Sequence, residues 1–380
     1  MIIPNINYHN AQLFGIELEH IFAKNWQFVA LADELANHRD FVCVELPDDS
    51  IVVQNFNGAL KAFKNVCTHR LNLIQTADRG NRHLMCAYHG WVFDAEGMPL
   101  GKGERQGFID SGESQAKLCL TRYRVESCGK FVFVSRDPGA LPLDDFLGEF
   151  APLLRDLSRY IGQETYYGVV PHAANWKLLV ENVLECYHCS TVHPETFVAG
   201  LGVGRKAITD VQVAGSHSSG HFPRIPTKRE ALRRKIVSHL NDREFTHDSF
   251  FHIHIFPNLF ISSTEGTAFY VGHALPWSAT ETRLRVRLFE PNVELTEAGR
   301  LRQDAINKQG SALALQVIEE DRAILETVQR GISIADRPAV LGSEEIRIRA
   351  FHKAYTERMT EARNDTPTLR ETTLHTDVFA

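Results

Sequence analysis

Cys67-Thr-His69 and, sixteen residues later, Cys86-Ala-Tyr-His89-Gly-Trp91 form the stretch that decides the fold. Each end of this stretch offers one thiolate and one imidazole. A closed zinc site of two cysteines and two histidines is the first interpretation, but zinc fingers usually group cysteine with cysteine and histidine with histidine. One residue of each type per loop favours a two-iron cluster, because thiolates can hold one iron and imidazoles the other.

Short apolar runs separated by turn signals surround these loops. The runs are FVCVEL (41–46), IVVQNF (51–56), ALKAF (59–63), WVFD (91–94) and KFVFVS (130–135). Pro47-Asp48-Asp49 and Asn57-Gly58 separate the first three, which is typical of consecutive antiparallel hairpins. We therefore predict a small all-β domain over residues 41–155. Residues 1–40 are expected to form a helical segment that packs on a second domain, residues 156–380.

A second cluster of polar residues lies within 175–194, NWKLLVENVLECYHCSTVHP. Asn182, Glu185 and His188 are spaced three apart, so on a helix they share one face. His193 follows five residues after His188. On an ideal helix this spacing would point the two side chains in different directions. If the helix loosens or ends before Pro194, a residue that disfavours helix just before it, both histidines can face one metal ion.

Cys186 and Cys189 allow other interpretations of the same segment. A redox-active Cys-x-x-Cys motif would need a strand-to-helix context that is missing here, and haem attachment would need histidine at 190, where serine stands. Free, buried cysteines are the ordinary alternative. The chain has seven cysteines, an odd number spread thinly, which argues against a disulfide framework.

The segment 294–331 predicts a long helix that ends near Gly331. Its apolar stripe consists of Ala314, Val317, Ile318, Ile324, Leu325 and Val328. Asp321 lies on this stripe, whereas Glu320 and Glu326 lie off it. Because an unpaired buried carboxylate is costly, Asp321 needs a cation or strong hydrogen bonds, and a metal held by the two histidines would supply the cation. A frayed helix or a salt bridge to arginine is the alternative.

Composition limits the remaining possibilities. At about 150 residues per domain, 380 residues correspond to about two domains. The net charge of −6 argues against nucleic acid or a membrane as partner, and no apolar stretch is long enough to span a bilayer. The opening MIIPNINYHN has no secretory pattern, so we expect a cytoplasmic protein.

The second domain should contain a sheet. Strands are expected at HIHIF (252–256), LFISS (259–263), AFYVGHAL (268–275) and TRLRVRLFE (282–290). Arg283, Arg285 and Arg287 alternate with apolar residues in the last of these, which predicts one solvent-exposed sheet face. The basic cluster of Lys228, Arg229, Arg233, Arg234 and Lys235 is typical of a solvated helix face.

Taken together, the two clusters resemble the oxygenase component, or alpha subunit, of the Rieske non-haem iron oxygenases, over nearly the full chain. The resemblance implies an α+β fold: a small all-β Rieske domain and a helix-and-antiparallel-sheet, helix-grip-like catalytic domain. It implies one 2Fe-2S cluster held by Cys67, His69, Cys86 and His89. It also implies one mononuclear Fe(II) held by His188, His193 and Asp321.

The resemblance further implies how the two centres communicate. Glu185, with Asn182 on the same helix face, would be the catalytic residue that bridges the cluster of one chain and the iron of the next, as in a homotrimer. Electrons would come from a separate reductase or ferredoxin, and NAD(P)H would act only through that partner. Dioxygen would be the co-substrate, and the product a hydroxylated or demethylated small organic molecule.

The substrate is less constrained. Glu185-Cys-Tyr-His188-Cys resembles the branch that oxidises carnitine and betaines, whereas other members attack aromatic rings. Aromatic residues that could surround an amine or an arene, or equally form sheet core, are Phe251, Phe256, Phe260, Phe269, Tyr270 and Trp277. A Rieske-type electron carrier without oxygenase activity is an alternative of a different class, and a zinc-based structural protein is another.

Overall fold

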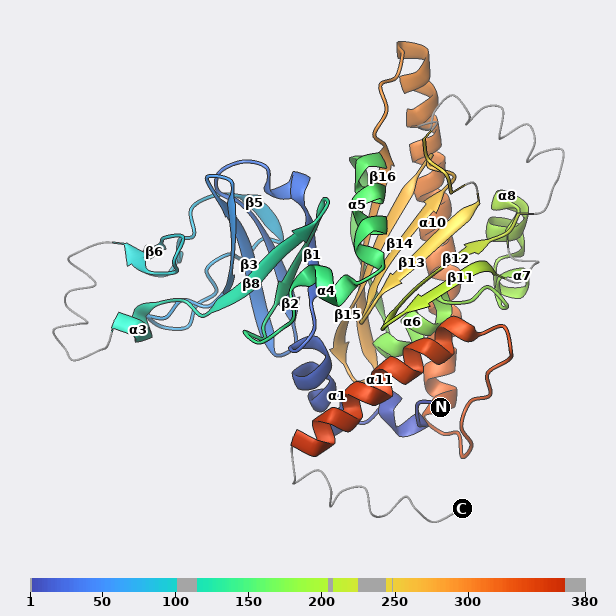
Figure 1. Ribbon diagram of the computed structural model, residues 1–380, viewed down its shortest axis with the longest axis horizontal. Coiled ribbons are helices and arrows are strands. Elements are labelled where there is room, and N and C mark those ends of the chain that lie inside the picture. Colours follow the sequence, from blue (N-terminus) through green and yellow to red (C-terminus); the bar gives the residue numbers. More distant parts are fainter. Residues whose placement is uncertain (1, 101–114, 204–207, 225–243, 248, 366–380) are drawn as a thin grey trace. The chain divides into compact units, whose positions relative to one another are not determined.

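The computed structural model describes residues 2–100, 115–203, 208–224, 244–247 and 249–365 (Figure 1). The chain divides into two compact units. One consists of Met1–Ile21 and Leu147–Ala380, and the other of Phe22–Phe146. The overall α+β class is that expected from the sequence. The basic cluster at 228–235 lies outside the described residues, and no described helix combines the length and hydrophobicity of a membrane span.

The Phe22–Phe146 unit is built on a seven-stranded antiparallel sheet with the order β1-β9-β8-β4-β3-β2-β5, and a separate two-stranded sheet, β6-β7. The strands are β1 (Gln27–Leu31), β2 (Asp40–Leu46), β3 (Asp49–Phe56), β4 (Ala59–Lys64), β5 (Arg79–Asn81), β6 (Val92–Phe93), β7 (Pro99–Leu100), β8 (Arg122–Cys128) and β9 (Phe131–Ser135). Its described helices are short: η3 (Ala32–Leu35), α3 (Gln115–Leu118) and α4 (Leu143–Leu147). The consecutive hairpins predicted from turn signals are confirmed as β2, β3 and β4.

The turn between β3 and β4 shows why the sequence signal was reliable. Asn57 and Gly58 both have positive φ, at 55° and 91°. Two consecutive residues with positive φ match the twist of an antiparallel hairpin, and asparagine and glycine tolerate this conformation best.

The expected N-terminal segment, 1–40, is divided between the two units. Its first part contains η1 (Asn5–Tyr8) and α1 (Ala11–Glu17), whose N-cap Asn10 accepts hydrogen bonds from Gln12 and Leu13. η2 (Leu18–Phe22) follows. The later part, residues 22–40, belongs to the smaller unit. It contains the strand β1, which pairs with β9 of that same unit, and the short helix η3.

The larger unit contains a second seven-stranded antiparallel sheet, with the order β10-β16-β15-β14-β13-β12-β11. Its strands are β10 (Ile161–His172), β11 (Thr209–Ala214), β12 (His217–Phe222), β13 (Phe250–Ile255), β14 (Leu259–Thr264), β15 (Phe269–Ser278) and β16 (Glu281–Pro291). Its later helices are α5 (Phe150–Tyr160), α6 (Trp176–Val183), α7 (Cys189–Val192), η4 (Pro194–Val198), α8 (Ala199–Leu201), α10 (Glu297–Ile332) and α11 (Ile346–Asp365). The four strands predicted between 252 and 290 are confirmed as β13 to β16, and the predicted long helix is α10.

The expectation of a wet sheet face on β16 is wrong. Arg285 and Arg287 are only 5% and 1% exposed. The Arg287 guanidinium lies 5.5 Å from the ring centre of Tyr167 on the neighbouring strand β10. A guanidinium can be buried in this way because its long stem is apolar and its charge is attracted to an aromatic face.

Candidate metal centres

The two Cys/His loops of the smaller unit have the same backbone construction. In the first, Leu71 N–H donates to the Cys67 carbonyl at 3.0 Å, and Cys67 N–H donates to the Asn72 carbonyl at 2.9 Å. The second loop has the same two hydrogen bonds with the same spacing from its cysteine. Gly90 N–H donates to the Cys86 carbonyl at 3.0 Å, and Cys86 N–H donates to the Trp91 carbonyl at 2.8 Å. Leu71 and Gly90, at equivalent positions, both have positive φ. Each loop therefore presents its cysteine and histidine from a matching turn.

The side chains of the loops converge. Cys67 and Cys86 are both 1% exposed, and the rings of His69 and His89 lie 4.5 Å apart between centroids. Burial raises the pKa of the Cys67 thiol to about 11. Burial also acts to raise that of Cys86, but hydrogen bonds from the backbone, led by Tyr88, and from Cys67 and Asn72 lower its pKa below the ordinary value. His69 also stacks on Trp91, at 5.0 Å and 10°.

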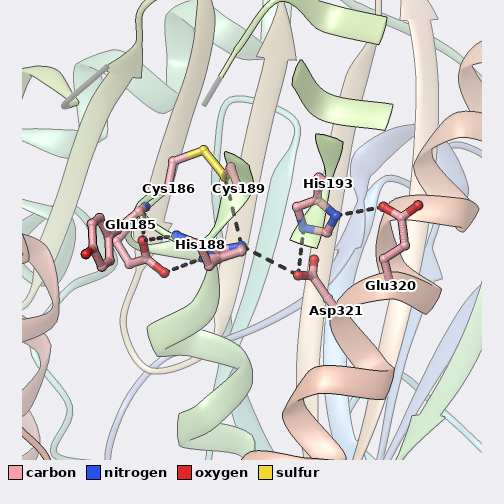
Figure 2. The surroundings of a disulfide bond; sticks show 8 residues. Glu185, Cys186, His188, Cys189, His193, Glu320 and Asp321 are labelled. Atoms are coloured by element: carbon pink, nitrogen blue, oxygen red, sulfur yellow. Dashed lines mark hydrogen bonds and ion pairs between the residues drawn. A yellow bond between two sulfur atoms is a disulfide. The ribbon is translucent and has the colours of Figure 1, made fainter. Parts of the chain in front are cut away.

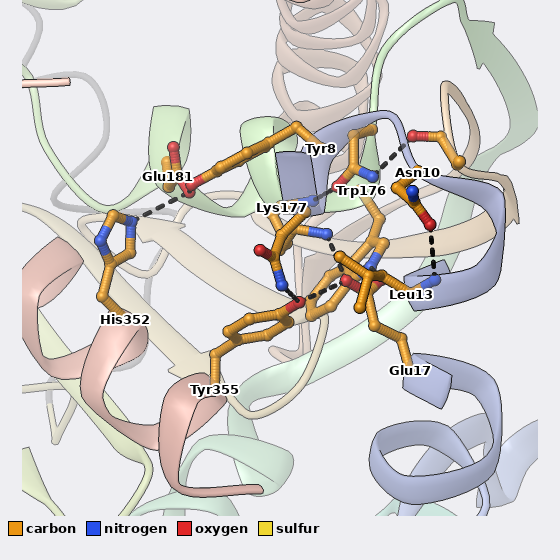
Figure 3. Close-up of polar contacts among 12 residues, drawn as sticks. Tyr8, Asn10, Leu13, Glu17, Trp176, Lys177, Glu181, His352 and Tyr355 are labelled. Carbon is orange, nitrogen blue, oxygen red and sulfur yellow. Dashed lines mark hydrogen bonds and ion pairs between the residues drawn. The ribbon is translucent and has the colours of Figure 1, made fainter. Parts of the chain in front are cut away.

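Helix α6 leads into the second cluster and is anchored by a buried polar network (Figure 3). Its N-cap Asn175 accepts from Lys177 N–H at 2.9 Å. The Lys177 ammonium pairs with Glu17 at 2.6 Å, and both side chains are 0% exposed. Tyr8 and His352 both reach Glu181, at 2.6 and 3.1 Å. These contacts tie the start of the chain and α11 to the helix that precedes Glu185.

The expected common helix face of Asn182, Glu185 and His188 is not present. α6 ends at Val183, and α7 begins only at Cys189. Glu185 instead stabilises the turn between them, because its carboxylate accepts from the backbone N–H groups of Tyr187 and His188. The condition under which both histidines can face one metal ion is met, since α7 ends at Val192, before Pro194.

This broken helix brings His188 and His193 together with Asp321 of α10 (Figure 2). One donor atom from each of the three residues lies within 4.8 Å of the others. Asp321 Oδ1 is 2.9 Å from His193 Nε2 and 3.6 Å from His188 Nε2. Two imidazoles and one carboxylate form the donor set of a facial triad, which suits ferrous iron and leaves coordination positions open.

A second carboxylate lies beside each of the two histidines. Glu185 contacts His188 Nδ1, and Glu320 Oε2 lies 2.8 Å from His193 Nδ1. Burial lowers the pKa of His193, but hydrogen bonds and charges from Asp321 and Glu320 outweigh it and raise the value. Glu320 lies off the apolar stripe of α10, and its contact with His193 depends on tertiary structure, so the sequence alone did not indicate a role for it.

Cys186 and Cys189, on either side of His188, form a disulfide in the structure (Figure 2). The expectation of free thiols at these positions is therefore wrong. Their Cα atoms are 5.0 Å apart, because the turn between α6 and α7 brings the two positions together. Residue spacing alone did not show this turn.

The three residues open into a cavity of about 1230 Å³ in the larger unit. Asn182, Glu185, Phe260, Phe269 and Tyr270 also line it, whereas Phe251, Phe256 and Trp277 are not among the lining residues. Asp321 faces this cavity, which explains why its side chain keeps 17% exposure. The apolar stripe of α10 is narrower than expected, since Ile324 and Val328 are 45% and 41% exposed.

Comparison with known families is consistent with both centres. The family model "Ring hydroxylating alpha subunit (catalytic domain)" matches residues 158–361, more than half of the chain. The chain belongs to this family. The family model "Rieske [2Fe-2S] domain" matches residues 25–106 of this chain.

Individual relatives support the same family. The alpha subunit is 33% identical over 195 residues to the carnitine monooxygenase oxygenase subunit of Acinetobacter pittii. It is also 33% identical over 201 residues to the large oxygenase component of the naphthalene 1,2-dioxygenase system of Pseudomonas putida. These matches cover 50% of this chain, and 52% and 44% of the relatives, so the chain spans about half the length of the curated relatives it matches.

A solved structure shares the fold of the alpha subunit over nearly the whole chain. It is a quaternary ammonium Rieske monooxygenase in complex with an inhibitor, with a TM-score of 0.76 and 22% identity. The similarity covers 94% of this chain and 95% of the other. At this identity, the similarity describes the fold alone.

Proposed function

We propose that the protein is the terminal oxygenase component of a multicomponent Rieske oxygenase. It would use dioxygen and electrons from a separate reductase or ferredoxin to hydroxylate or demethylate a small organic substrate. The observation that carries the proposal is the presence, in one chain, of a convergent Cys/His pair of loops and a separate two-histidine, one-carboxylate donor set beside a large cavity.

The proposed ligands follow from these donor sets. Cys67, His69, Cys86 and His89 would hold one 2Fe-2S cluster, and His188, His193 and Asp321 would hold one mononuclear Fe(II). Iron in the second set would supply the chemistry of dioxygen activation. The protein supplies the geometry, since His193 is 2% exposed and cannot leave its position without opening the buried surroundings.

Glu185 is the proposed coupling residue. Its carboxylate contacts His188 Nδ1 and is 13% exposed, so it touches an iron ligand and still reaches the surface. Asn182 lines the cavity beside it, and we propose that it orients substrate or water there. In a homotrimer, Glu185 would meet the cluster of the neighbouring chain. Exposed side chains beside both centres are consistent with such a contact: Leu71 at 75%, Tyr88 at 51% and Tyr187 at 85%.

A quaternary or N-methyl amine is the proposed substrate class. Three phenyl rings line the cavity: Phe197, Phe222 and Phe250. The ring of Phe197 lies 5.9 Å from that of His193 between centres. Phe250 lies 5.1 Å from Phe197 and 5.5 Å from Phe222 between ring centres. Glu185, Glu195 and Asp321 also line the cavity, while its described lining contains no lysine or arginine. Aromatic faces and carboxylates attract a cation.

Ring hydroxylation of an arene is the second candidate function. The same three phenyl rings can stack on an aromatic substrate, and the cavity lining is largely apolar. An uncharged arene also needs no basic partner, whereas the carboxylate of a betaine or carnitine would need one.

Oxygen uptake with a generic ferredoxin reductase tests the proposal and separates the substrate classes. The panel contains choline, glycine betaine, carnitine, an N-methyl amine and indole. Amine-dependent uptake with release of formaldehyde or an aldehyde supports the amine assignment, and a ring diol from indole supports the arene candidate. If no compound stimulates uptake and the chain only exchanges single electrons with the reductase, the oxygenase proposal is wrong.

A further inference from the structure

We propose that Glu320 is a positioning residue that orients His193 and strengthens metal binding at the mononuclear site. The inference rests on the proposed function, because it assigns His193 to that site. It goes beyond the ligand set itself and concerns the side chain on the far edge of one ligand ring.

The two ring nitrogens of His193 face two different carboxylates (Figure 2). Nε2 lies 2.9 Å from Asp321 Oδ1, on the side shared with His188, and Nδ1 lies 2.8 Å from Glu320 Oε2. If Nε2 binds the metal, Nδ1 carries the hydrogen and donates it to Glu320. A carboxylate in this position fixes the tautomer and ring orientation of a metal-binding histidine and makes the imidazole a stronger ligand.

Glu320 is itself held in place. Thr196 Oγ1 donates to Oε2 at 2.7 Å, and Gln316 Nε2 donates to Oε1 at 3.1 Å. Both carboxylate oxygens therefore have defined partners, one from η4 and one from the preceding turn of α10. Glu320 and Asp321 are adjacent in α10. One turn of this helix therefore supplies both a proposed ligand, Asp321, and the carboxylate that orients another proposed ligand, His193.

The arrangement around His193 matches that around His188. Each histidine has a carboxylate at Nδ1, Glu185 for His188 and Glu320 for His193. The two differ in setting, because Glu185 also accepts backbone N–H groups, whereas Glu320 accepts from the side chains of Thr196 and Gln316. We therefore assign orientation of the ligand ring, and not coupling between centres, to Glu320.

Metal affinity tests this assignment directly. The protein is prepared with its cluster intact, and mild chelation empties the mononuclear site. It is then titrated with Co(II). High-spin Co(II) is followed by electron paramagnetic resonance while the cluster is oxidised. Loss of an outer partner of this kind typically weakens metal binding by about 10–100-fold. We expect that loss for Glu320→Ala and a smaller one for Glu320→Gln, which keeps an acceptor oxygen but not the charge. The matched control is Glu319→Gln, because Glu319 is 58% exposed and pairs with Arg322 away from the site.

The outcomes separate the inference from the proposed function. A Co(II) affinity and resonance signal of Glu320→Ala equal to the unaltered protein would overturn the positioning role, while the oxygenase proposal would stand. Failure of the unaltered protein to bind Co(II) would instead remove the mononuclear site and with it both proposals. If Glu320→Ala loses its cluster spectrum, the variant is misfolded and cannot test the role. Thr196→Val then tests it, because this change removes only the hydroxyl that holds Glu320. It should weaken Co(II) binding several-fold, and unchanged binding there would also overturn the role.

Discussion

Lys177→Met should destabilise the larger unit strongly, because it removes one partner of a fully buried ion pair. Glu17 accepts hydrogen bonds from Lys177 at 2.6 Å, from Trp176 Nε1 at 2.8 Å and from Tyr355 Oη at 2.6 Å. The Lys177 ammonium also lies about 5 Å from three aromatic ring centres, including that of Tyr8 at 5.1 Å. Burial lowers the pKa of Lys177, while the charge of Glu17 acts to raise it.

The expected size follows from this burial. With both side chains 0% exposed, removal of the ammonium leaves an uncompensated buried carboxylate, which typically costs about 3–5 kcal/mol of folding free energy. In a domain of this size, each kcal/mol of lost stability lowers the melting temperature by about 2–4 °C. The melting temperature of the variant should therefore be lower by roughly 6–20 °C. The double variant Glu17→Gln with Lys177→Met should recover much of this loss, because no unpaired charge is then buried.

Urea unfolding followed by tryptophan fluorescence provides the measurement, with the visible spectrum of the cluster as a report on the smaller unit. Lys353→Met is the matched control, since Lys353 is 73% exposed and pairs with Glu357 at 3.8 Å. A surface pair of this kind contributes about 0.5 kcal/mol or less. Loss of a buried pair should cost about 3–5 kcal/mol. If the unfolding free energy of Lys177→Met lies within about 1 kcal/mol of that of the control, the reasoning is refuted.

Three further predictions concern the bridge, the response to acid and the disulfide. Glu185→Gln should keep the cluster spectrum and iron content but turn over far more slowly in the oxygen-uptake assay; full activity would remove its coupling role. Burial lowers the pKa of His254 to about 3, so between that value and about 6.5 the unfolded chain binds more protons at this residue than the folded chain. His254 alone should therefore lower the folding stability at pH 5 by about 2 kcal/mol relative to pH 8, and the buried His252 and His273, whose pKa values burial also lowers, act in the same direction. Urea midpoints check this, and His254→Gln should show a flatter pH dependence than the unaltered protein. Reduction of Cys186–Cys189 should lower stability by no more than about 2 kcal/mol, because the closed loop is so short; a larger shift of the urea midpoint with dithiothreitol would contradict this.

Local sequence signals predicted the hairpins and the Cys/His loops of the smaller unit, because both depend on residues close together in the chain. Asn57-Gly58 is a turn that almost any context preserves. The equivalence of the two Cys/His loops was less visible, since Leu71 and Gly90 differ as residue types although both have positive φ. Only the backbone hydrogen bonds show that the loops are built alike.

The larger unit was harder to predict because its elements depend on long-range contacts. β10 was missed because most of its residues are half-buried and it contains Gly162, Gly168 and Pro171, which all disfavour strands. α11 carried a usable signal, because buried apolar residues recur along it at intervals of three and four: Ile348, Phe351, Tyr355, Met359 and Ala362.

The candidate iron site shows the same division. Asp321 was predictable because helical periodicity sets the face of a residue, and α10 is a regular helix. Glu320 was not, because its partners Thr196 and His193 lie more than 120 residues away in the chain. Arg287 was expected in solvent for a similar reason, since the ring of Tyr167 that covers it belongs to a strand the sequence did not reveal.

Metal and acid-labile sulfide analysis of the purified protein, compared with Asp321→Ala, tests the central claim most directly. The account predicts about three irons and two sulfides per chain in the unaltered protein, of which two irons and both sulfides belong to the cluster. Asp321→Ala should lose one iron and keep the cluster spectrum unchanged. A colourless protein that contains zinc, or an Asp321→Ala variant that retains the third iron, would contradict it.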